Sequence, residues 1–224
     1  MKKLLLFLLC FTGHFSRGQS FEILFGDSAS ECNATSVIQL PSGNIILLTH
    51  CISTAAAAEN YLFKFSSSGT LLGQFLINQQ DFHAEKMKLL PDGHLIIAGS
   101  VIDSTVHTDG LLLKCDTTAS IIWSEAFGTG FTNEMLAGIT INNSGNIISS
   151  GYTKNNSGPG NAIYMVCTDS NGNLLWEKSF SASFNSYADQ VIALADQSLM
   201  ISGDRQVTLQ SYSNVVIRTD SAGN

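Results

Sequence analysis

Hydrophobic and polar positions along the chain form a pattern of about fifty residues that occurs four times. In each copy, short apolar runs alternate with turn sequences rich in Gly, Asn, Asp and Ser. Four of these turns set the alignment: Pro41–Asn44, Pro91–His94, Asn143–Asn146 and Asp196–Ser198. With Gly43, Gly93, Gly145 and Gln197 treated as equivalent, successive copies are 50, 52 and 52 residues apart. A fixed period of this length is the signature of a repeat architecture.

The other columns of the alignment predict four strands in each copy. An apolar residue lies six positions before each anchor: Val37, Met87, Ile139 and Val191. The run after the anchor predicts the next strand: Ile45–Leu48, Leu95–Ala98, Ile147–Ile148 and Leu199–Ile201. Three copies close this strand on a glycine: Gly99, Gly151 and Gly203. A third strand is predicted at Tyr61–Phe65, Leu111–Cys115, Ile163–Thr168 and Val215–Thr219.

A second tight turn and a fourth strand complete each copy. The turn is predicted at Ser66–Gly69, Asp116–Ala119, Asp169–Gly172 and Asp220–Gly223. Asx side chains that hydrogen-bond their own backbone, with Gly or Asn able to adopt positive φ, explain this composition. The fourth strand pairs Trp123 with Phe127 and Trp176 with Phe180, whereas an earlier copy has Gly73 in the tryptophan column and only Phe75 as the later aromatic residue.

These units predict an all-β fold made of antiparallel four-stranded meanders. Consecutive apolar residues in the strands require cover on both faces of a sheet, and sheets stacked around a ring supply it. We therefore expect a β-propeller of four-stranded antiparallel blades built from four repeat units. A β-sandwich is the competing architecture, but a sandwich does not require copies of one unit. A helical solenoid is excluded because no sustained 3.6-residue period follows the N-terminal segment.

The two ends of the repeat region are out of phase with whole units. Phe21–Gly26 fits the fourth-strand pattern, with Phe21 in the tryptophan column and Phe25 matching Phe127. The chain ends at Asn224, in the turn before another fourth strand. Either the N-terminal strand completes the last blade of a four-bladed ring, or this chain is the leading part of a larger propeller. We favour the second interpretation, an incomplete propeller, because four-bladed rings are uncommon.

The N-terminal segment predicts export from the cell. Met1–Lys3 is basic, Leu4–Phe11 is an apolar run interrupted by Cys10, and Ser16 and Gly18 are small residues ahead of a cleavage site. The run is shorter than the roughly twenty residues of a membrane-spanning helix. We expect residues 1–18 to be a signal peptide and residues 19–224 to form the repeats, in units of about 21–73, 74–123, 124–176 and 177–224. The expected location is extracellular or at the cell surface.

Charge excludes one class of partner. Without the predicted signal peptide, the chain keeps 8 of its 11 basic residues and all 18 acidic residues, a formal charge of −10. Nucleic acids and anionic membranes are bound by clustered Lys and Arg, so this balance argues against both. We expect no nucleic-acid partner and no membrane-spanning segment in the mature chain.

Four cysteines remain after the predicted cleavage, and their spacing has nothing of the close Cys-x-x-Cys pairs of a zinc site. Cys32 lies eleven residues before Gly43, and Cys51 lies eight residues after it. Paired positions on a hairpin that turns at Ser42 and Gly43 sum to about 85, and these two sum to 83, so the cysteines should face each other within disulfide reach. We predict a Cys32–Cys51 disulfide, which export permits, and buried thiols at Cys115 and Cys167.

A longer motif carries a family resemblance. Its fullest form joins Gly145–Ile148, Ser150–Thr153 and Thr168–Trp176. In these residues the chain resembles secreted β-propeller repeat proteins of the Bacteroidota type, whose repeats of about 50 residues end in Asp-Ser-Asn-Gly-Asn-Leu-Leu-Trp. The resemblance implies the architecture and says little about activity. Such proteins often carry a C-terminal sorting domain for type IX secretion, and nothing in this chain corresponds to it.

Candidate chemistry in the sequence is sparse. The aromatic residues of the fourth strands resemble those of quinoprotein dehydrogenases only in their turn-and-tryptophan pattern, so we interpret Trp123, Phe127, Trp176 and Phe180 as packing anchors between blades. Asp169, Asn171 and Asn173 have the spacing that begins a calcium loop but lack a downstream bidentate acid, which favours a plain Asx turn.

No catalytic group stands out in the sequence. The histidines His50, His83, His94 and His107 form no short paired motif, and no Gly-x-Ser-x-Gly elbow is present. We interpret the acids near the first strands, Glu31, Glu85, Glu134 and Asp189, as sharing no column of the alignment and therefore as forming no repeated ring. We therefore assign no catalytic, cofactor-binding or metal-binding residue, and we expect no cofactor.

These observations predict a secreted noncatalytic propeller module that binds or scaffolds an extracellular protein or glycan at the cell surface. Its expected contact segments are the loops between the second and third strands: 53–60, 100–109, 153–161 and 204–214. The alternative is an extracellular enzyme built on a propeller, either a quinoprotein-like oxidoreductase or a glycan-active hydrolase or lyase.

Overall fold

The computed structural model describes residue 22 and residues 30–53, 58–102, 107–128, 132–154, 160–180 and 184–224. These residues form strands arranged in four antiparallel sheets, each a meander in which every strand pairs with the next strand of the chain. Sheet 1 contains β1 (Ser30–Gln39), β2 (Ile45–Ser53), β3 (Glu59–Phe65) and β4 (Leu71–Ile77). Sheet 2 contains β5 (Phe82–Leu89), β6 (Leu95–Ile102), β7 (Thr108–Cys115) and β8 (Ile121–Phe127).

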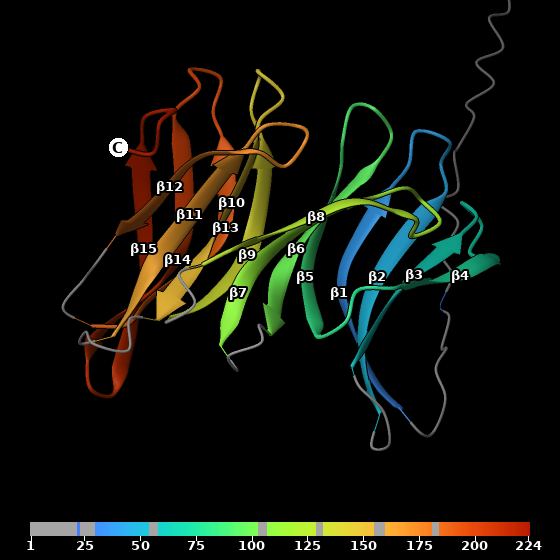
Figure 1. Cartoon of the computed structure of the whole chain (residues 1–224), viewed down its shortest axis with the longest axis horizontal. Helices are drawn as coiled ribbons and strands as arrows, with labels where there is room; N and C mark the ends of the chain where they lie inside the picture. Colours follow the sequence, from blue (N-terminus) through green and yellow to red (C-terminus); the bar gives the residue numbers. More distant parts are fainter. Residues whose placement is uncertain are drawn as a thin grey trace, which may run out of the picture.

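Sheet 3 contains β9 (Asn133–Ile141), β10 (Ile147–Lys154), β11 (Asn161–Thr168) and β12 (Leu174–Phe180). Sheet 4 contains β13 (Ser186–Ala193), β14 (Leu199–Thr208) and β15 (Ser211–Thr219). The four sheets lie side by side in chain order, as Figure 1 shows along its horizontal axis. The all-β meander predicted from the alternating pattern is therefore present. The predicted signal peptide, and the predicted strand Phe21–Gly26 apart from Glu22, lie outside the described residues.

Apolar side chains fill the space between successive sheets. The first strand of each later sheet, β5, β9 or β13, packs against the sheet before it. Ile46, Leu48 and Leu62 of sheet 1 meet Leu95, Ile97 and Leu113 of sheet 2. Two further clusters lie between sheets 2 and 3 and between sheets 3 and 4, around Leu112 and Leu136 and around Met165 and Val191. This packing explains why both faces of the inner sheets read as apolar in the sequence.

Asparagine side chains tie each sheet to the next by hydrogen bonds to the backbone. Asn60 of β3 donates from Nδ2 to the carbonyl oxygen of Phe82 at 2.8 Å and accepts from the Ala84 N–H at 3.2 Å. Asn133 at the start of β9 accepts from the Thr108 N–H at 3.0 Å, and Asn185 before β13 accepts from the Asn161 N–H at 2.8 Å. The sheets are thus joined by buried polar contacts as well as by apolar packing.

The tight turns share one hydrogen-bond pattern at both turn positions of the repeat. Here each turn is counted so that Leu40 is the first residue and Gly43 the fourth, and likewise in the other turns. The N–H of the fourth residue donates to the carbonyl oxygen of the first, and the N–H of the first residue donates to the carbonyl oxygen of the fifth. The fourth residue has positive φ, which glycine adopts without strain. Gln197 and Ala119 occupy this position with φ of 67° and 63°, where other copies have glycine. The missing anchor glycine of the last unit therefore leaves the turn geometry unchanged.

Every first strand carries a β-bulge at the same position of the repeat. Its pairing with the second strand slips by one residue, and the unpaired residues are Thr35, Glu85, Ala137 and Asp189. The bulge explains the glycine column opposite it. A Cβ on Gly99, Gly151 or Gly203 would lie within 2.0 Å of the carbonyl oxygen of His83, Met135 or Tyr187. Sheet 1 has Thr49 at this position.

Tryptophans of the fourth strands lie against the second tight turn of the following sheet. A Cβ on Gly172 would be 3.1 Å from the Trp123 ring, and a Cβ on Gly223 would be 3.0 Å from the Trp176 ring. Phe127 is buried between sheets 2 and 3, and Phe180 packs against the cluster between sheets 3 and 4. In the described part of the chain, the buried Trp123 Nε1 has no hydrogen-bond partner.

Two strand predictions are wrong in detail. Ile77 rather than Phe75 occupies the place of Phe127, since Ile77 pairs with Asn60 as Phe127 pairs with Gly110. Residues 204–214 are not a long loop, because β14 and β15 pair as far as Thr208 and Ser211. This segment is polar, as a loop would be, but its residues pair across a hairpin between β14 and β15.

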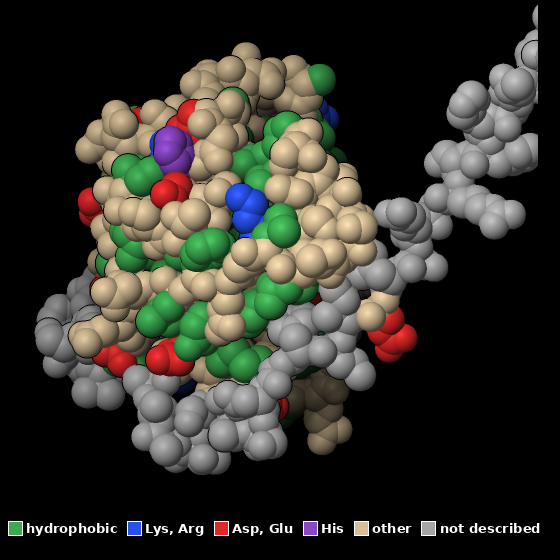
Figure 2. Space-filling model, turned by 90° about the vertical axis from the view of Figure 1, so that its right-hand side faces the viewer, with side chains coloured by type: hydrophobic (Ala, Val, Ile, Leu, Met, Phe, Trp, Pro, Cys, Tyr) green, Lys and Arg blue, Asp and Glu red, His purple; other side chains and the backbone are tan. Residues whose placement is uncertain are grey.

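The tight turns lie at one end of the sheets, and the second strands end and the third strands begin at the other (Figure 1). Residues 54–57, 103–106 and 155–159 of the expected contact loops lie outside the described residues. Figure 2 shows the molecule from the side of sheet 1, where hydrophobic side chains form separate patches between polar ones. Val37, Leu72 and Leu76 are among the exposed aliphatic residues of this sheet. No helix capable of crossing a bilayer occurs in the described ranges.

Candidate functional site

The cysteines adopt the two states that their positions predict. Cys32 and Cys51 form a disulfide between directly opposed residues of β1 and β2. Cys115 and Cys167 are free and buried. Burial raises the pKa of Cys115 to about 12 and that of Cys167 to about 11. Since the thiolate is the reactive form, these two thiols are poor nucleophiles and serve the core.

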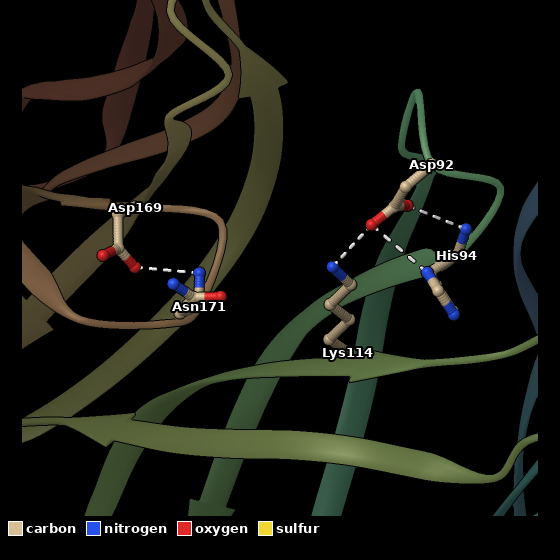
Figure 3. Close-up of polar contacts among 5 residues, drawn as sticks. All are labelled: Asp92, His94, Lys114, Asp169 and Asn171. Atoms are coloured by element: carbon tan, nitrogen blue, oxygen red, sulfur yellow. Dashed lines mark hydrogen bonds and ion pairs between the residues drawn. The ribbon is translucent and has the colours of Figure 1, made fainter.

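Asp169 forms an Asx turn in this structure. Its Oδ1 accepts from the N–H of Asn171 at 2.8 Å (Figure 3). Oδ1 also accepts from the N–H of Asn173 at 3.0 Å, and Oδ2 accepts from the Asn173 side-chain amide at 2.8 Å. These hydrogen bonds, led by the one from the Asn173 side chain, lower the pKa of Asp169. The spacing that resembles a calcium loop is thus used to close the turn between β11 and β12.

Asp92 joins a tight turn of sheet 2 to its third strand. It accepts from the His94 N–H at 3.0 Å and from Lys114 Nζ at 2.7 Å, and His94 Nδ1 lies 3.2 Å from its Oδ2 (Figure 3). Burial opposes ionisation, but the hydrogen bonds from Lys114 and His94 lower the pKa of Asp92 to about 2. Lys114 is itself buried. This arrangement stabilises the turn and gives the buried ammonium its partner.

Two histidines that are distant in sequence come together between sheets 1 and 2. The rings of His50 and His83 are 4.0 Å apart between centroids, and His83 Nε2 lies 3.5 Å from Glu85 Oε1. Asn60 Oδ1 accepts from the Ala84 N–H and lies 2.9 Å from His50 Nδ1. Because an amide oxygen can only accept, His50 Nδ1 is the donor of this second hydrogen bond. Burial, and then the proximity of His50, lower the pKa of His83. Across the residues that the structure describes, no three His, Cys, Asp or Glu side chains form a metal site.

The interpretation that the first-strand acids share no column is wrong for two of them. Glu85 and Asp189 both occupy the bulge position, eight residues before their anchors. A bulge turns its unpaired side chain away from the regular alternation, and bulges are common beside functional sites. Asp189 lines a hollow between sheets 3 and 4, and Glu134 lines a different hollow. The bulge column is therefore the repeat feature that leads to the candidate site.

Three tyrosines line a hollow between sheets 3 and 4. It has a volume of about 370 Å³ and is lined by Tyr152 of β10, Tyr187 of β13, Tyr212 of β15, Asp189 and Asp204, with Met135, Ala137 and Ala188. The rings of Tyr152 and Tyr187 meet edge to face, with centroids 5.2 Å apart and planes at 81°. The rings of Tyr187 and Tyr212 are 6.4 Å apart and tilted by 36°. The hollow thus has an aromatic wall and an acidic side.

A second hollow adjoins the first through Tyr152 and Tyr187, which line both. Its volume is about 510 Å³, and its other lining residues are Thr108, Asn133, Lys154, Asn161 and Asn185. Asn133 and Asn185 hold the strand ends of the preceding sheets through their Oδ1 atoms. We call the two hollows together the tyrosine groove. It lies at the end of the sheets opposite the tight turns, where Thr108, Lys154 and Asn161 begin or end their strands.

Electrostatics differ between the two halves of the tyrosine groove. Burial, and then the repulsion of Asp204, raise the pKa of Asp189. Burial, and then Tyr212, raise the pKa of Tyr187, while burial and Glu85 raise that of Tyr152. The hydroxyls of Tyr152 and Tyr187 therefore remain protonated at neutral pH and can donate hydrogen bonds. The first hollow carries two carboxylates, and the second carries Lys154.

Glu134 lies in a third hollow, of about 240 Å³, which Thr153, Tyr164 and Glu177 also line. Glu134 is almost completely buried, and its Oε1 accepts from Thr132 and, at 2.6 Å, from Thr153. Tyr164 donates to Glu177 at 2.6 Å. Burial is the largest cause that raises the pKa of Glu134, and the charges of Asp109 and Glu177 add to it. The hydrogen bonds from Thr132 and Thr153 act in the opposite direction and lower the pKa of Glu134.

Comparison with known proteins shows a likeness of fold. No protein-family model matches the chain, and no curated protein matches it in sequence. A protein of unknown function from Dyadobacter fermentans DSM 18053 matches with a TM-score of 0.59 at 11% identity, over 88% of this chain and 63% of that one. The endo-arabinase of Bacteroides thetaiotaomicron VPI-5482 matches with a TM-score of 0.52 at 13% identity, over 80% of this chain and 72% of that one.

The alpha-L-arabinanase of Penicillium chrysogenum, solved with arabinobiose, matches with a TM-score of 0.55 at 15% identity, over 82% of this chain and 60% of that one. The fold is propeller-like. The chain spans less than two thirds of the length of the Dyadobacter and Penicillium proteins. At these identities the likeness concerns the arrangement of the sheets and carries nothing over about activity.

No feature of the sequence predicts a site at the tyrosines. Tyr152 lies within a repeat motif, and neither Tyr187 nor Tyr212 belongs to any short motif. They come from three strands of two units, so no short spacing unites them. A signal was present in the alignment, because Asp189 shares the column of Glu85. The ends of the expected contact loops do reach the groove, at Thr108, Lys154 and Asn161.

Proposed function

We propose that this chain is an exported, noncatalytic module of β-propeller blades that binds an extracellular ligand in the tyrosine groove. One observation carries the proposal: Tyr152 and Tyr187 form an edge-to-face corner shared by two adjoining hollows. Ligand sites in proteins are concave, with aromatic walls and a few polar groups that fix orientation. The groove has this composition, with carboxylates in one half and amides and a lysine in the other.

The rigidity of the surroundings supports a binding role. Tyr187 pairs with Asp204 and Tyr152 pairs with Ile163 within regular strand ladders, so both backbones are fixed. Side chains on strands lose little freedom when a ligand binds, because the sheet has already ordered them. Tyrosine adds a large apolar face and a hydroxyl that can donate a hydrogen bond. The groove therefore offers a preformed surface.

Export is part of the proposal and rests on three features. The basic and apolar start of the chain has the form of a signal peptide. The Cys32–Cys51 disulfide suits an oxidising compartment. The acidic composition keeps such a protein soluble outside the cell. We further propose that the chain is of the secreted repeat type that its motif resembles, and that its four sheets are blades.

Binding to a glycan array and to immobilised extracellular proteins tests this function. The full chain is compared with the double variant Tyr152→Ala/Tyr187→Ala, and we expect the variant to lose binding by about tenfold or more, since each buried aromatic contact contributes about 1 kcal/mol. Tyr61→Ala, on β3 of sheet 1, is the matched control and should bind as the wild type does. Equal binding by the double variant, or no binding by the wild-type chain to either set, would overturn the proposal.

A second function is favoured by the hollow around Glu134. Glycoside hydrolysis uses a protonated carboxyl as the acid and a second carboxylate as base or nucleophile. Glu134, whose pKa is raised, and Glu177 line one hollow and have these two roles available. Release of reducing ends from plant and bacterial polysaccharides is the assay. Turnover that Glu134→Gln abolishes, with the fold retained, would establish the enzyme; turnover unaffected by Glu134→Gln and Glu177→Gln would exclude this site.

A further inference from the structure

The acidic half of the tyrosine groove brings together two carboxylates from different strands. Asp189 is the bulge residue of β13, and Asp204 lies on β14 directly opposite Tyr187. Both line the first hollow, and the charge of Asp204 acts on Asp189. In the described part of the chain, neither forms an ion pair with Lys, Arg or His. Two like charges on one hollow are repulsive, and a cation in that hollow relieves the repulsion.

The aromatic wall of the same hollow also suits a cation. An ammonium group is attracted to a tyrosine face within about 6 Å of the ring centroid. Tyr152, Tyr187 and Tyr212 supply three rings, and adjacent rings lie 5.2 and 6.4 Å apart. Because Tyr152 and Tyr187 meet edge to face, they form two sides of a corner. An ammonium in this corner contacts ring faces and carboxylates together, and each type of contact strengthens as water is excluded.

The second hollow selects what is attached to the ammonium group. Lys154 lines it and repels a second cation. Asn133, Asn161, Asn185 and Thr108 provide amide and hydroxyl groups, which suit a ligand with several hydroxyls. Asn185 is already oriented, since its Nδ2 donates to Gln206 Oε1 at 2.8 Å while its Oδ1 holds the Asn161 N–H. A neutral, hydroxyl-rich portion therefore fits beside a single cationic portion.

We propose that the tyrosine groove binds an oligosaccharide with one unacetylated amino sugar, whose ammonium group lies between Asp189, Asp204 and the tyrosine corner. The neighbouring sugar occupies the amide-lined hollow. This inference rests on the proposed function of the groove and names its ligand class. No covalent step is involved, because the ligand is held by charge, ring faces and hydrogen bonds.

The test uses two disaccharides that differ by one acetyl group. Calorimetry compares glucosaminyl-N-acetylglucosamine with di-N-acetylchitobiose as ligands of the full chain. We expect the free amine to bind at least tenfold more tightly. Asp189→Asn and Asp204→Asn keep the side-chain shape and should each weaken its binding by about tenfold, as expected for loss of a hydrogen bond to a charged group. Asp196→Asn, on the turn between β13 and β14, is the matched control and should bind the free-amine disaccharide as tightly as the wild type does.

Four results separate the outcomes. Equal binding of both disaccharides, with loss in the tyrosine double variant, overturns the amine preference and leaves the groove as the binding site. Binding of a lysine-containing peptide, but of neither disaccharide, overturns the proposal that the ligand is a sugar and leaves the groove as the binding site. Binding of the free amine that Asp189→Asn and Asp204→Asn do not weaken overturns the assignment of the ammonium to this hollow. Binding that also survives the tyrosine double variant overturns the proposed function itself.

Discussion

Cys32 lies directly opposite Cys51 on β1 and β2 because Thr35 is left out of the strand pairing. Between the turn and Ser36, paired residues follow the register in which Gln39 faces Ile45. Beyond the bulge the register slips by one, so that Cys32 faces Cys51 rather than Ile52. The bulge that recurs in every sheet therefore has a specific role in sheet 1, where it aligns the two thiols. The disulfide closes the end of the hairpin away from its turn.

Removing the disulfide should destabilise the protein through the unfolded chain. The cysteines are 19 residues apart, and a crosslink over a loop of this size contributes about 3 kcal/mol. We expect the free energy of unfolding of Cys32→Ser/Cys51→Ser to be lower by that amount, which urea titration shows as a lower midpoint. Dithiothreitol should lower the wild-type midpoint to that of the double variant and leave the variant itself unchanged. A reductant effect of equal size in both proteins would contradict the assignment.

Gln197→Gly should stabilise the protein. Gln197 has φ of 67° in the turn between β13 and β14, and left-handed backbone costs a residue with a Cβ about 1 kcal/mol. Its side chain is exposed, so little packing is lost. The reverse change, Gly145→Gln, should destabilise by a similar amount, since Gly145 has φ of 80° and open space where a Cβ would lie. Thermal unfolding of both variants measures the pair, and shifts of the same sign would refute the explanation.

Gly151→Ala should be more damaging than a turn substitution. A Cβ at Gly151 would lie 1.7 Å from the Met135 carbonyl oxygen, so the two backbones would have to move apart, as they do in sheet 1 where Thr49 holds this position. Overpacking of this kind costs about 3 kcal/mol. Gly145→Ala, whose Cβ meets nothing, is the control and should cost about 1 kcal/mol from its positive φ alone. Chemical unfolding gives the comparison, and equal losses in the two variants would mean that the bulge tolerates a side chain.

Glu134→Gln should make the stability of the protein less dependent on pH. Burial raises the pKa of Glu134 above 4.5, so the folded state holds this proton more firmly than the unfolded state does. The stabilising contribution is complete below about pH 4.5 and is lost as pH rises through the raised pKa. We expect wild type and variant to be similar near pH 4 and the variant to be more stable at pH 7, because glutamine carries no buried charge.

Asp169→Asn is the control, because its effect on stability at high pH should have the opposite sign to that of Glu134→Gln. Hydrogen bonds from Asn173 and from backbone N–H groups lower the pKa of Asp169 below 3.8. Its contribution is present above that value and is lost as pH falls. Urea unfolding between pH 3 and pH 8 should therefore show the difference from wild type growing with pH for both variants but with opposite signs. A pH-independent effect of Glu134→Gln would refute the role of its charge.

Local patterns in the sequence were sufficient for the strands and turns. Strand alternation and Asx-Gly turns depend on neighbouring residues, and the structure has both where the alignment expects them. Counting outward from Gly43 brought Cys32 and Cys51 close together. Of the offset of two positions, one comes from the turn, which pairs Gln39 with Ile45, and one comes from the bulge at Thr35. Strand ends were underestimated, because polar residues such as Asn161 and Ser211 continue the ladders.

The tyrosine groove could not be found in the same way. Tyr152, Tyr187 and Tyr212 lie on different strands. The rings of Tyr152 and Tyr187 meet because sheet 4 packs on sheet 3, and those of Tyr187 and Tyr212 lie on the two outer strands of sheet 4. The raised pKa of Asp189 likewise depends on burial and on Asp204, which is fifteen residues away along the chain. Contacts between sheets leave no short spacing in a sequence. What the sequence does retain is the bulge column, which becomes visible once the strand pairing is known.

The contact between each tryptophan and the following turn makes the order of the units specific. Trp123 lies on Gly172, and Trp176 lies on Gly223. Where the tryptophan column has Gly73, the corresponding turn has Ala119, whose methyl group is buried in the cluster between sheets 1 and 2. Two junctions thus combine a tryptophan with a glycine, whereas at the first junction Gly73 and Ala119 are both small and the ring of Phe75 covers Gly73, where a Cβ would lie 2.6 Å from it. Deleting the second unit would set Gly73 against Gly172 and leave a void, so these repeats are neighbours fitted in sequence and cannot be exchanged as identical modules.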